Sequence, residues 1–247
     1  MTDDARDAIM RATYEALCAE GYSDLTAQRI ADRTEKSKAA LFYHYDSVDG
    51  LLASFIEYLL TGYERRVEAL DGVPPEERLA AYVEWWVDIS PDEGTGHHTA
   101  MLELRAQAPY NELFQERLRE SDEALRDTLV DILTDGVESG AFSEHDPETA
   151  ADFLLGAFVG ARIRHFTLGR AAYSERAYEA ARAYIETEIL APETTYPDEP
   201  AVTFPPDERF TDAADGDVSE DGEDVTESDD RRETATVDSA DDHEGTE

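Results

Sequence analysis

Apolar side chains recur every three to four positions along most of the first 190 residues, which is the spacing of one face of an α-helix. Between residues 4 and 20 this face consists of Ile9, Ala12, Thr13, Ala16 and Leu17. Gly21 follows as a helix stop. Between residues 48 and 66, after the capping residue Ser47, the face consists of Leu51, Leu52, Phe55, Ile56, Leu59, Leu60 and Tyr63. Both segments therefore predict amphipathic helices.

The same periodicity continues after a break at residues 72–75, Gly-Val-Pro-Pro, and predicts helices at 75–90, 97–107, 110–138, 147–168 and 174–190. Asp146 and Pro147 have the order of an N-cap followed by proline at the first helical position. Ser174 is suited to cap the last helix. Because no segment alternates apolar and polar residues with a period of two, we expect an all-α fold without strands.

Two short helices are predicted at residues 26–33 and 37–44, beginning at Thr26 and after Ser37. Two helices joined by a tight turn and packed on a preceding helix form the helix-turn-helix geometry. In that geometry the second helix enters the major groove of DNA. A plain helical hairpin with solvated polar faces has the same pattern, so the pattern leaves both alternatives open.

Charge separates this stretch from the rest of the chain. The 247 residues include 59 acidic side chains and carry a formal net charge of −38, yet the only two lysines are Lys36 and Lys38. Within residues 26–45 four basic residues outnumber Asp32 and Glu35. The acid-rich, lysine-poor composition resembles that of proteins from salt-loving organisms, in which a Debye length of ~3 Å screens self-repulsion. A mesophilic protein with an acidic tail is the alternative.

Cysteine content and the apolar segments indicate in which cellular compartment the protein is expected. Cys18 is the only cysteine, which excludes an internal disulfide framework. No apolar stretch is long enough to span a bilayer, and the acidic N-terminus lacks the order of a signal peptide. We therefore expect a cytoplasmic protein without a membrane partner.

Residues 25–52 resemble the N-terminal domain of the tetracycline-repressor (TetR) family. The diagnostic part is S-K-A-A-L-F-Y-H-Y, residues 37–45, followed by G-L-L at residues 50–52. Further along, Y-N-E-L-F and D-P-E-T-A-A-D-F-L-L-G-A-F-V-G-A-R also look family-like. The family consists of homodimeric, all-helical regulators of transcription.

The resemblance implies a three-helix helix-turn-helix head for DNA binding, residues 1–47, and a larger helical domain for dimerisation and ligand binding, residues 48–191. Residues 192–247 contain 21 acidic side chains and lose the apolar periodicity. Such a segment cannot bury enough apolar surface to order itself, so we expect an acidic disordered tail.

The predicted DNA-binding residues come from both lines of reasoning. The residue types alone place phosphate donors around the second short helix, namely Lys36, Lys38, Tyr43, His44 and Tyr45. The resemblance adds Ser37 and Ala39 as DNA-facing positions and Thr26 as the hydroxyl that opens the first short helix. It also implies that Leu41, Phe42 and Tyr45 pack the head.

Three positions depart from the family pattern. Glu35 and Lys36 occupy a turn in which the family usually has glycine and then an apolar residue. Val48, preceded by Asp46, replaces a lysine that often binds phosphate. We therefore expect fewer phosphate contacts than in relatives, a loss that suits molar salt, where each contact contributes less.

Candidates for an effector pocket are aromatic residues and arginines of the C-terminal half. Plain core packing is the alternative for each aromatic residue, and pairing with acids is the alternative for each arginine. The predicted pocket residues are Tyr82, Trp86, Arg105, Phe114, Phe158 and Arg162. Further candidates are Trp85, Phe153, Arg164, His165 and Phe166.

Small residues mark a possible contact between helices. Gly156, Ala157, Gly160 and Ala161 form a small face that lets another helix approach closely. The resemblance implies that dimerisation uses the last two long helices, and a contact within the chain is the alternative.

Metal and catalytic chemistry have little support in the sequence. His97 and His98, near Glu93 and Glu103, are metal-ligating residue types, but adjacent histidines point to different faces of a helix. The patterns G-x-S-x-G, H-E-x-x-H and G-x-x-x-x-G-K-[ST] do not occur in the sequence, so catalysis has no support from these motifs. We expect neither a metal nor another cofactor, and no enzymatic activity.

The sequence thus predicts a ligand-responsive homodimeric repressor that binds a palindromic operator. Its expected partners are double-stranded DNA, a second copy of the chain and a small-molecule effector of unknown identity. The alternative is a helical small-molecule-binding protein or enzyme whose DNA-binding head does not function.

Overall fold

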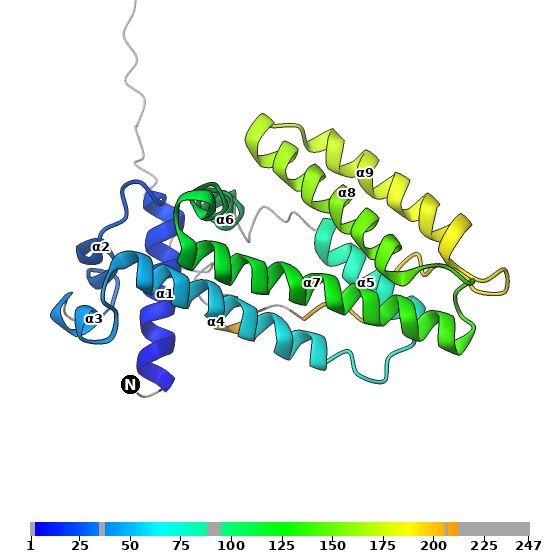
Figure 1. Cartoon of the computed structure of the whole chain (residues 1–247), viewed down its shortest axis with the longest axis horizontal. Coiled ribbons are helices and arrows are strands. Elements are labelled where there is room, and N and C mark those ends of the chain that lie inside the picture. The colour runs from blue at the N-terminus through cyan, green and yellow to red at the C-terminus, as the bar shows by residue number, and fades with distance from the viewer. Residues whose placement is uncertain (1–2, 35–37, 88–94, 206, 212–247) are drawn as a thin grey trace, which may run out of the picture. The chain divides into compact units, whose positions relative to one another are not determined.

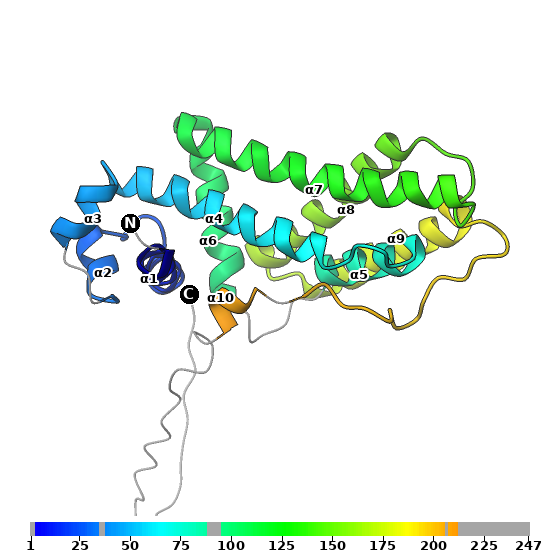
Figure 2. The same ribbon diagram turned by 90° about the horizontal axis from the view of Figure 1, so that it is seen from below.

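Helices make up most of the described residues in the computed structural model, which describes residues 3–34, 38–87, 95–205 and 207–211. The helices labelled in Figures 1 and 2 are α1 (Asp3–Glu20), α2 (Ala27–Ala31), α3 (Lys38–His44), α4 (Val48–Glu68), α5 (Pro75–Val87), α6 (Thr95–Gln107), α7 (Glu112–Ser139), α8 (Pro147–Leu168), α9 (Ala171–Tyr184) and α10 (Glu208–Thr211). All described residues belong to one compact unit, residues 1–216. Among them, only an isolated bridge between Phe142 and Leu190 has strand-like pairing, so the all-α prediction is confirmed.

Side-chain caps begin several helices where the sequence predicts them. The Thr26 hydroxyl accepts a hydrogen bond from the Arg29 backbone N–H at 3.3 Å, and the Ser47 hydroxyl accepts one from Gly50 at 2.9 Å. Asp146 caps α8 in the same way. These contacts satisfy backbone donors that the first turn of a helix leaves without partners. The Ser37 cap lies outside the described residues.

The predicted start of the last helix is wrong. Helix α9 begins at Ala171, three residues before Ser174. Gly169 ends α8 in the left-handed conformation, with φ of 62°. The chain therefore reverses at once, and only Arg170 separates Gly169 from α9. The Ser174 side chain instead lies 3.5 Å from Nδ1 of His165.

Two clusters of buried apolar side chains hold the fold together. One cluster joins α1, α2, α3 and the first half of α4 to α6 and the beginning of α7, through residues such as Leu17, Ile30, Leu41, Phe55 and Phe114. The other joins the end of α4 and the later part of α7 to α5, α8 and α9. Helices α4 and α7 pack along each other and contribute to both clusters. Among the described helices, none is long and apolar enough to cross a membrane.

The prediction that the chain is disordered from residue 192 is wrong for residues 192–205 and 207–211. Together with Ala191 these residues form a strap that runs from the end of α9 to α10 (Figure 2). Tyr196 and Phe204 are buried in the cluster of α5, α8 and α9. The Phe204 ring stacks on Trp85, with ring centroids 5.0 Å apart. The apolar content of this short stretch is enough to dock it, although its average composition is polar.

The far end of the strap docks on the other cluster. The Phe210 ring lies 4.7 Å from Tyr14 of α1. The Arg209 guanidinium lies 3.9 Å from the centroid of the Tyr58 ring and donates to the Tyr58 carbonyl at 2.9 Å. A Cβ at Gly62 would stand 1.5 Å from Arg209, so only glycine at this position of α4 admits the guanidinium.

Removing the strap should therefore destabilise the protein, whereas removing the residues after it should not. A chain ending at residue 191 loses two docked phenylalanines, each contributing about 1.5–3 kcal/mol when fully buried. We expect its melting temperature in molar KCl to fall by about 6 °C or more, since 1 kcal/mol corresponds to about 2–4 °C at this size. A chain ending at residue 211 should melt within about 2 °C of the full chain. Equal melting temperatures for the two truncations would contradict the docking.

Candidate DNA interface and ligand cleft

Helix α3 presents polar and aromatic side chains to solvent on one face and packs the head on the other. Ala39 and His44 are exposed, and the Tyr43 side chain is 85% exposed. Leu41 is buried between them in the cluster of the head. Residues 39 and 43 lie one helical turn apart and share a face. An exposed face of this kind is the part of a recognition helix that can enter the major groove.

The structure describes the side chains of Thr26 and Tyr45 among the other predicted DNA-binding residues, but not those of Lys36, Ser37 and Lys38. Thr26 caps α2 at the surface. Lys38 begins α3, but its side chain lies outside the description. Lys36 and Ser37 lie outside the described residues altogether. Tyr45 is half-buried against the head cluster, and burial raises the pKa of its hydroxyl.

The arginines that contribute to the basic balance of residues 26–45 are engaged within the head. Arg29 and Arg33 both pair with Glu20 of α1, Arg33 at 3.1 Å. These two arginines therefore tie α2 to α1, and part of their charge is neutralised before DNA approaches. The hydroxyl of Tyr43 and the imidazole of His44 on α3 are by contrast exposed.

The head is joined to the C-terminal helices by hydrogen bonds as well as by packing. Glu103 of α6 accepts a hydrogen bond from the backbone N–H of Tyr22 at 2.5 Å, just after α1 ends. Asn111, the N-cap of α7, donates to Asp49 in the first turn of α4 at 3.0 Å. Two helices of the C-terminal part thus hold backbone and side chains of the head.

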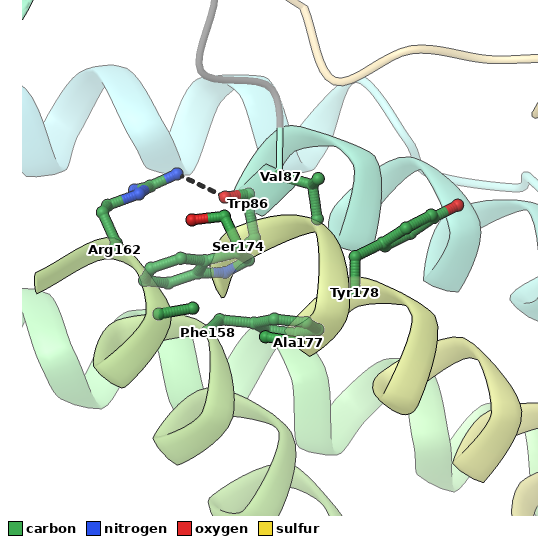
Figure 3. Close-up of a pocket in the computed structure, with 8 residues that line it drawn as sticks. Trp86, Val87, Phe158, Arg162, Ser174, Ala177 and Tyr178 are labelled. Atoms are coloured by element: carbon green, nitrogen blue, oxygen red, sulfur yellow. Dashed lines mark hydrogen bonds between the residues drawn. The ribbon is translucent and has the colours of Figure 1, made fainter. Parts of the chain in front are cut away.

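A small cleft opens between α5, α8 and α9 (Figure 3). It is narrow and partly open to solvent. Its lining residues are Trp86, Val87, Phe158, Ala161, Arg162, Ser174, Ala177 and Tyr178. The Trp86 and Phe158 rings stack at the cleft with centroids 6.0 Å apart.

Arg162 is the charged residue of this cleft. Its Nη2 donates to the backbone carbonyls of Trp86 at 2.8 Å and Trp85 at 3.4 Å, at the end of α5. Its guanidinium carbon lies 4.5 Å from the centroid of the Trp86 ring. Desolvation by burial lowers the pKa of Arg162 to about 10. The group keeps its positive charge at neutral pH.

Only three of the six predicted pocket residues line the cleft: Trp86, Phe158 and Arg162. Tyr82 is fully buried, and its hydroxyl donates to the Leu125 carbonyl at 2.9 Å. Phe114 packs in the head cluster, so it is a core residue. Arg105 lies 3.9 Å from Asp122 on α7.

The further aromatic and basic candidates also have other partners. Trp85 stacks on Phe204, and Arg164 donates to the Tyr173 hydroxyl at 2.8 Å. His165 and Phe166 contact each other, with ring centroids 4.7 Å apart. Phe153 is 54% exposed on α8. None of these five residues lines the described cleft.

The sequence analysis missed the contribution of α9 to the cleft. Ser174, Ala177 and Tyr178 are spaced i, i+3 and i+4, which places them on one helical face. That spacing is visible in the sequence, but the assignment of Ser174 as a cap hid it. Val87 could not be identified because an apolar residue at the end of a helix is equally suited to plain core packing.

Helix α8 carries an uncovered small-residue face on its outer side. A Cβ at Gly156 would have no atom within 4 Å, and one at Gly160 would meet only Arg164, at 3.9 Å. Ala157 is partly buried, and Ala161 is buried toward the cleft. Phe153 and Ile163, spaced i and i+10, share the face of Gly156 and Gly160 and are exposed. The glycines are therefore not used for a close helix contact among the described residues.

The histidines and acids considered for a metal have separate surroundings. The His98 ring stacks on Phe166 at 4.5 Å, while Glu103 binds the backbone of Tyr22. Glu93 and the His97 side chain lie outside the description. No group of three or more metal-ligating side chains is assembled in the described part of the chain.

Family models match both parts of the chain. Residues 9–55 match the model described as "Bacterial regulatory proteins, tetR family", and residues 75–190 match "BetI-type transcriptional repressor, C-terminal". No curated protein matches the sequence significantly.

Solved structures of similar fold include a TetR transcription regulator from Haloarcula marismortui, 38% identical, covering 76% of this chain and 100% of its own, with a TM-score of 0.70. A protein from Saccharomonospora viridis, described as a transcriptional regulator and solved in complex with choline, is 20% identical, with coverage of 77% and 100% and a TM-score of 0.67. A TetR transcriptional regulator from Chloroflexus aurantiacus is 19% identical, with coverage of 76% and 98% and a TM-score of 0.64.

The two family models and the 38% identity over the whole of the Haloarcula protein agree with the exposed recognition helix of the head. The chain belongs to the TetR family of DNA-binding transcriptional regulators.

Proposed function

We propose that the protein is a homodimeric repressor that inserts two copies of α3 into successive major grooves of a palindromic operator. The half-sites would lie about one helical turn apart, ~34 Å. A small molecule in the cleft between α5, α8 and α9 would release the DNA. The strongly acidic composition supports a cytoplasmic site of action at molar salt.

The observation that carries the DNA-binding part is the exposed face of α3. Ala39, Tyr43 and His44 are exposed on a short helix whose opposite side is buried through Leu41. A small residue at position 39 permits close approach to the bases, while a hydroxyl and an imidazole can donate to phosphates or base edges. We assign DNA contact to these three residues together with Thr26, Lys36, Ser37, Lys38 and Tyr45.

The uncovered face of α8 supports the homodimer. Exposed Phe153 and Ile163 flank Gly156 and Gly160, so an identical helix can approach closely and cover apolar surface. A self-complementary face of this kind produces a two-fold axis, which matches the symmetry of a palindromic site.

The position of α6 supports the release step. Helix α6 packs on α1 of the head and also contacts α8, which lines the cleft. Glu103 ties it to the backbone that follows α1. A ligand that moves α8 would therefore act on the head through α6, and DNA affinity would change only if the ligand prefers one of the two arrangements.

Replacing Tyr43 or His44 with alanine should weaken specific DNA binding by about 10-fold to 100-fold, because a lost base or phosphate contact corresponds to about 1–3 kcal/mol. The operator can be isolated by pull-down from genomic DNA in molar KCl, and affinity measured by footprinting. Tyr110→Ala is the matched control, since Tyr110 is 88% exposed and lies outside the head. Both head variants should keep the melting temperature of the wild type. Unchanged protection by the Tyr43→Ala, His44→Ala double variant would refute this assignment.

Placing a long charged side chain on the α8 face should dissociate the dimer. Gly156→Arg has open space within the monomer, so the variant should fold but block the approach of a second α8. We expect the mass from light scattering to fall from that of a dimer to that of a monomer. Ala106→Arg, at an exposed position of α6, is the control and should stay dimeric. If Gly156→Arg remains a dimer, the interface lies elsewhere.

A further inference from the structure

Two hydrogen-bond donors at the cleft between α5, α8 and α9 are buried. The Nε atom of Arg162 and the indole Nε1 of Trp86 have no hydrogen-bond partner of good geometry among the described residues, although the Trp86 side chain interacts with the Tyr82 hydroxyl. Both residues line the cleft (Figure 3). A buried donor without an acceptor costs about 1–3 kcal/mol, so an occupant that supplies acceptors is favoured over one that supplies donors.

The positive charge of Arg162 also favours a ligand that supplies hydrogen-bond acceptors. In the described part of the chain, eight other arginines lie within 4.0 Å of a carboxylate, but Arg162 does not. Its acceptors are two backbone carbonyls. Burial lowers its pKa most, the Tyr82 hydroxyl raises it, and the positive charge of Arg105 lowers it further. A chain with 59 acidic residues thus leaves its cleft arginine without a carboxylate from the described residues. A desolvated cation without a counter-ion favours an anionic ligand.

The remaining residues that line the cleft indicate which part of a ligand would lie away from Arg162. Phe158, Ala161, Ala177 and Tyr178 contribute apolar surface, and the Ser174 hydroxyl is the polar group contributed by α9. The face of the Trp86 ring is already covered by the guanidinium of Arg162 and by Phe158. An aromatic face needed for a quaternary ammonium is therefore occupied, and Arg162 would repel such a cation.

We propose that the effector is a small carboxylate with an apolar body, whose carboxylate binds Arg162 and Trp86 while its apolar part packs against α8 and α9. This inference rests on the proposed role of the cleft as the effector site. It distinguishes the protein from the Saccharomonospora structure, which was solved with choline.

Binding can be followed without a label, because the only two tryptophans of the chain are Trp85 and Trp86. The probes are benzoate, phenylacetate and hexanoate, each titrated against its primary amide, with choline as the cationic probe. We expect at least one carboxylate to change tryptophan fluorescence saturably, with affinity at least about 10-fold above its amide and above choline. A matched amide keeps the shape of the ligand and removes only its charge, so the comparison needs no variant.

Variants of two arginines test whether Arg162 is the residue that binds the carboxylate of the ligand. Arg162→Gln should lower carboxylate affinity at least about 10-fold, whereas Arg105→Gln should leave it unchanged. Circular dichroism checks that the Arg162→Gln variant folds. If it does not fold, the comparison of each acid with its amide on the wild-type protein decides whether the site prefers a carboxylate. The proposal is overturned if no carboxylate binds saturably, if amide or choline binds as tightly, or if a folded Arg162→Gln keeps full affinity.

A further variant tests whether a carboxylate of the chain itself, instead of a ligand, pairs with Arg162. Asp88, Asp92 and Glu93 follow Val87 in the sequence and lie outside the described residues. A variant with Asp88→Asn, Asp92→Asn and Glu93→Gln should bind the carboxylate probes at least as well as the wild type. Binding confined to this variant would assign Arg162 to a chain carboxylate and overturn the proposal.

Footprinting separates this inference from the proposed function. If a carboxylate binds at the cleft but the operator stays protected, the ligand class stands and the release step fails. If no operator is protected with or without the probe, DNA binding fails while the fluorescence result still decides the ligand class.

Discussion

The packing of α4 along α7 is the contact on which the rest of the structure depends. Each helix supplies side chains to both apolar clusters: Phe55 of α4 and Phe114 of α7 to the head cluster, Tyr63 of α4 and Leu133 of α7 to the other. Helix α4 begins at Val48, and residues 45–47 separate it from the end of α3 at His44. A continuous set of buried contacts along α4 and α7 therefore joins the C-terminal cluster to the head.

The strap reinforces this link by contacting both clusters. Phe204 stacks on Trp85, one residue before the tryptophan that lines the cleft, while Phe210 packs beside Tyr14 in the head cluster. The match to the C-terminal family model ends at residue 190. The docked segment therefore lies beyond the matched region, and it closes the same two clusters that α4 and α7 already join.

The electrostatics of the described helices show how an acidic chain places its arginines. Arg29 and Arg33 pair with Glu20 and so join α2 to α1. Arg209 pairs with Asp207 of its own segment and donates to the Tyr58 carbonyl of α4. Arg162 differs because its described acceptors are the carbonyls that end α5, where the helix dipole carries partial negative charge. No carboxylate among the described residues pairs with Arg162.

The sequence by itself determined the all-α class, the positions of α1 to α8 within a few residues, and the caps at Thr26, Ser47 and Asp146, because helical periodicity and capping are local properties. The family motif that contains Ala39, Tyr43 and His44 also predicts α3 as the DNA-facing element. Only the tertiary structure decided that Phe114 is core, that Arg29 and Arg33 are paired, and that Phe204 docks. These outcomes depend on contacts between side chains that are far apart in the sequence. Local patterns such as helical periodicity do not indicate those contacts.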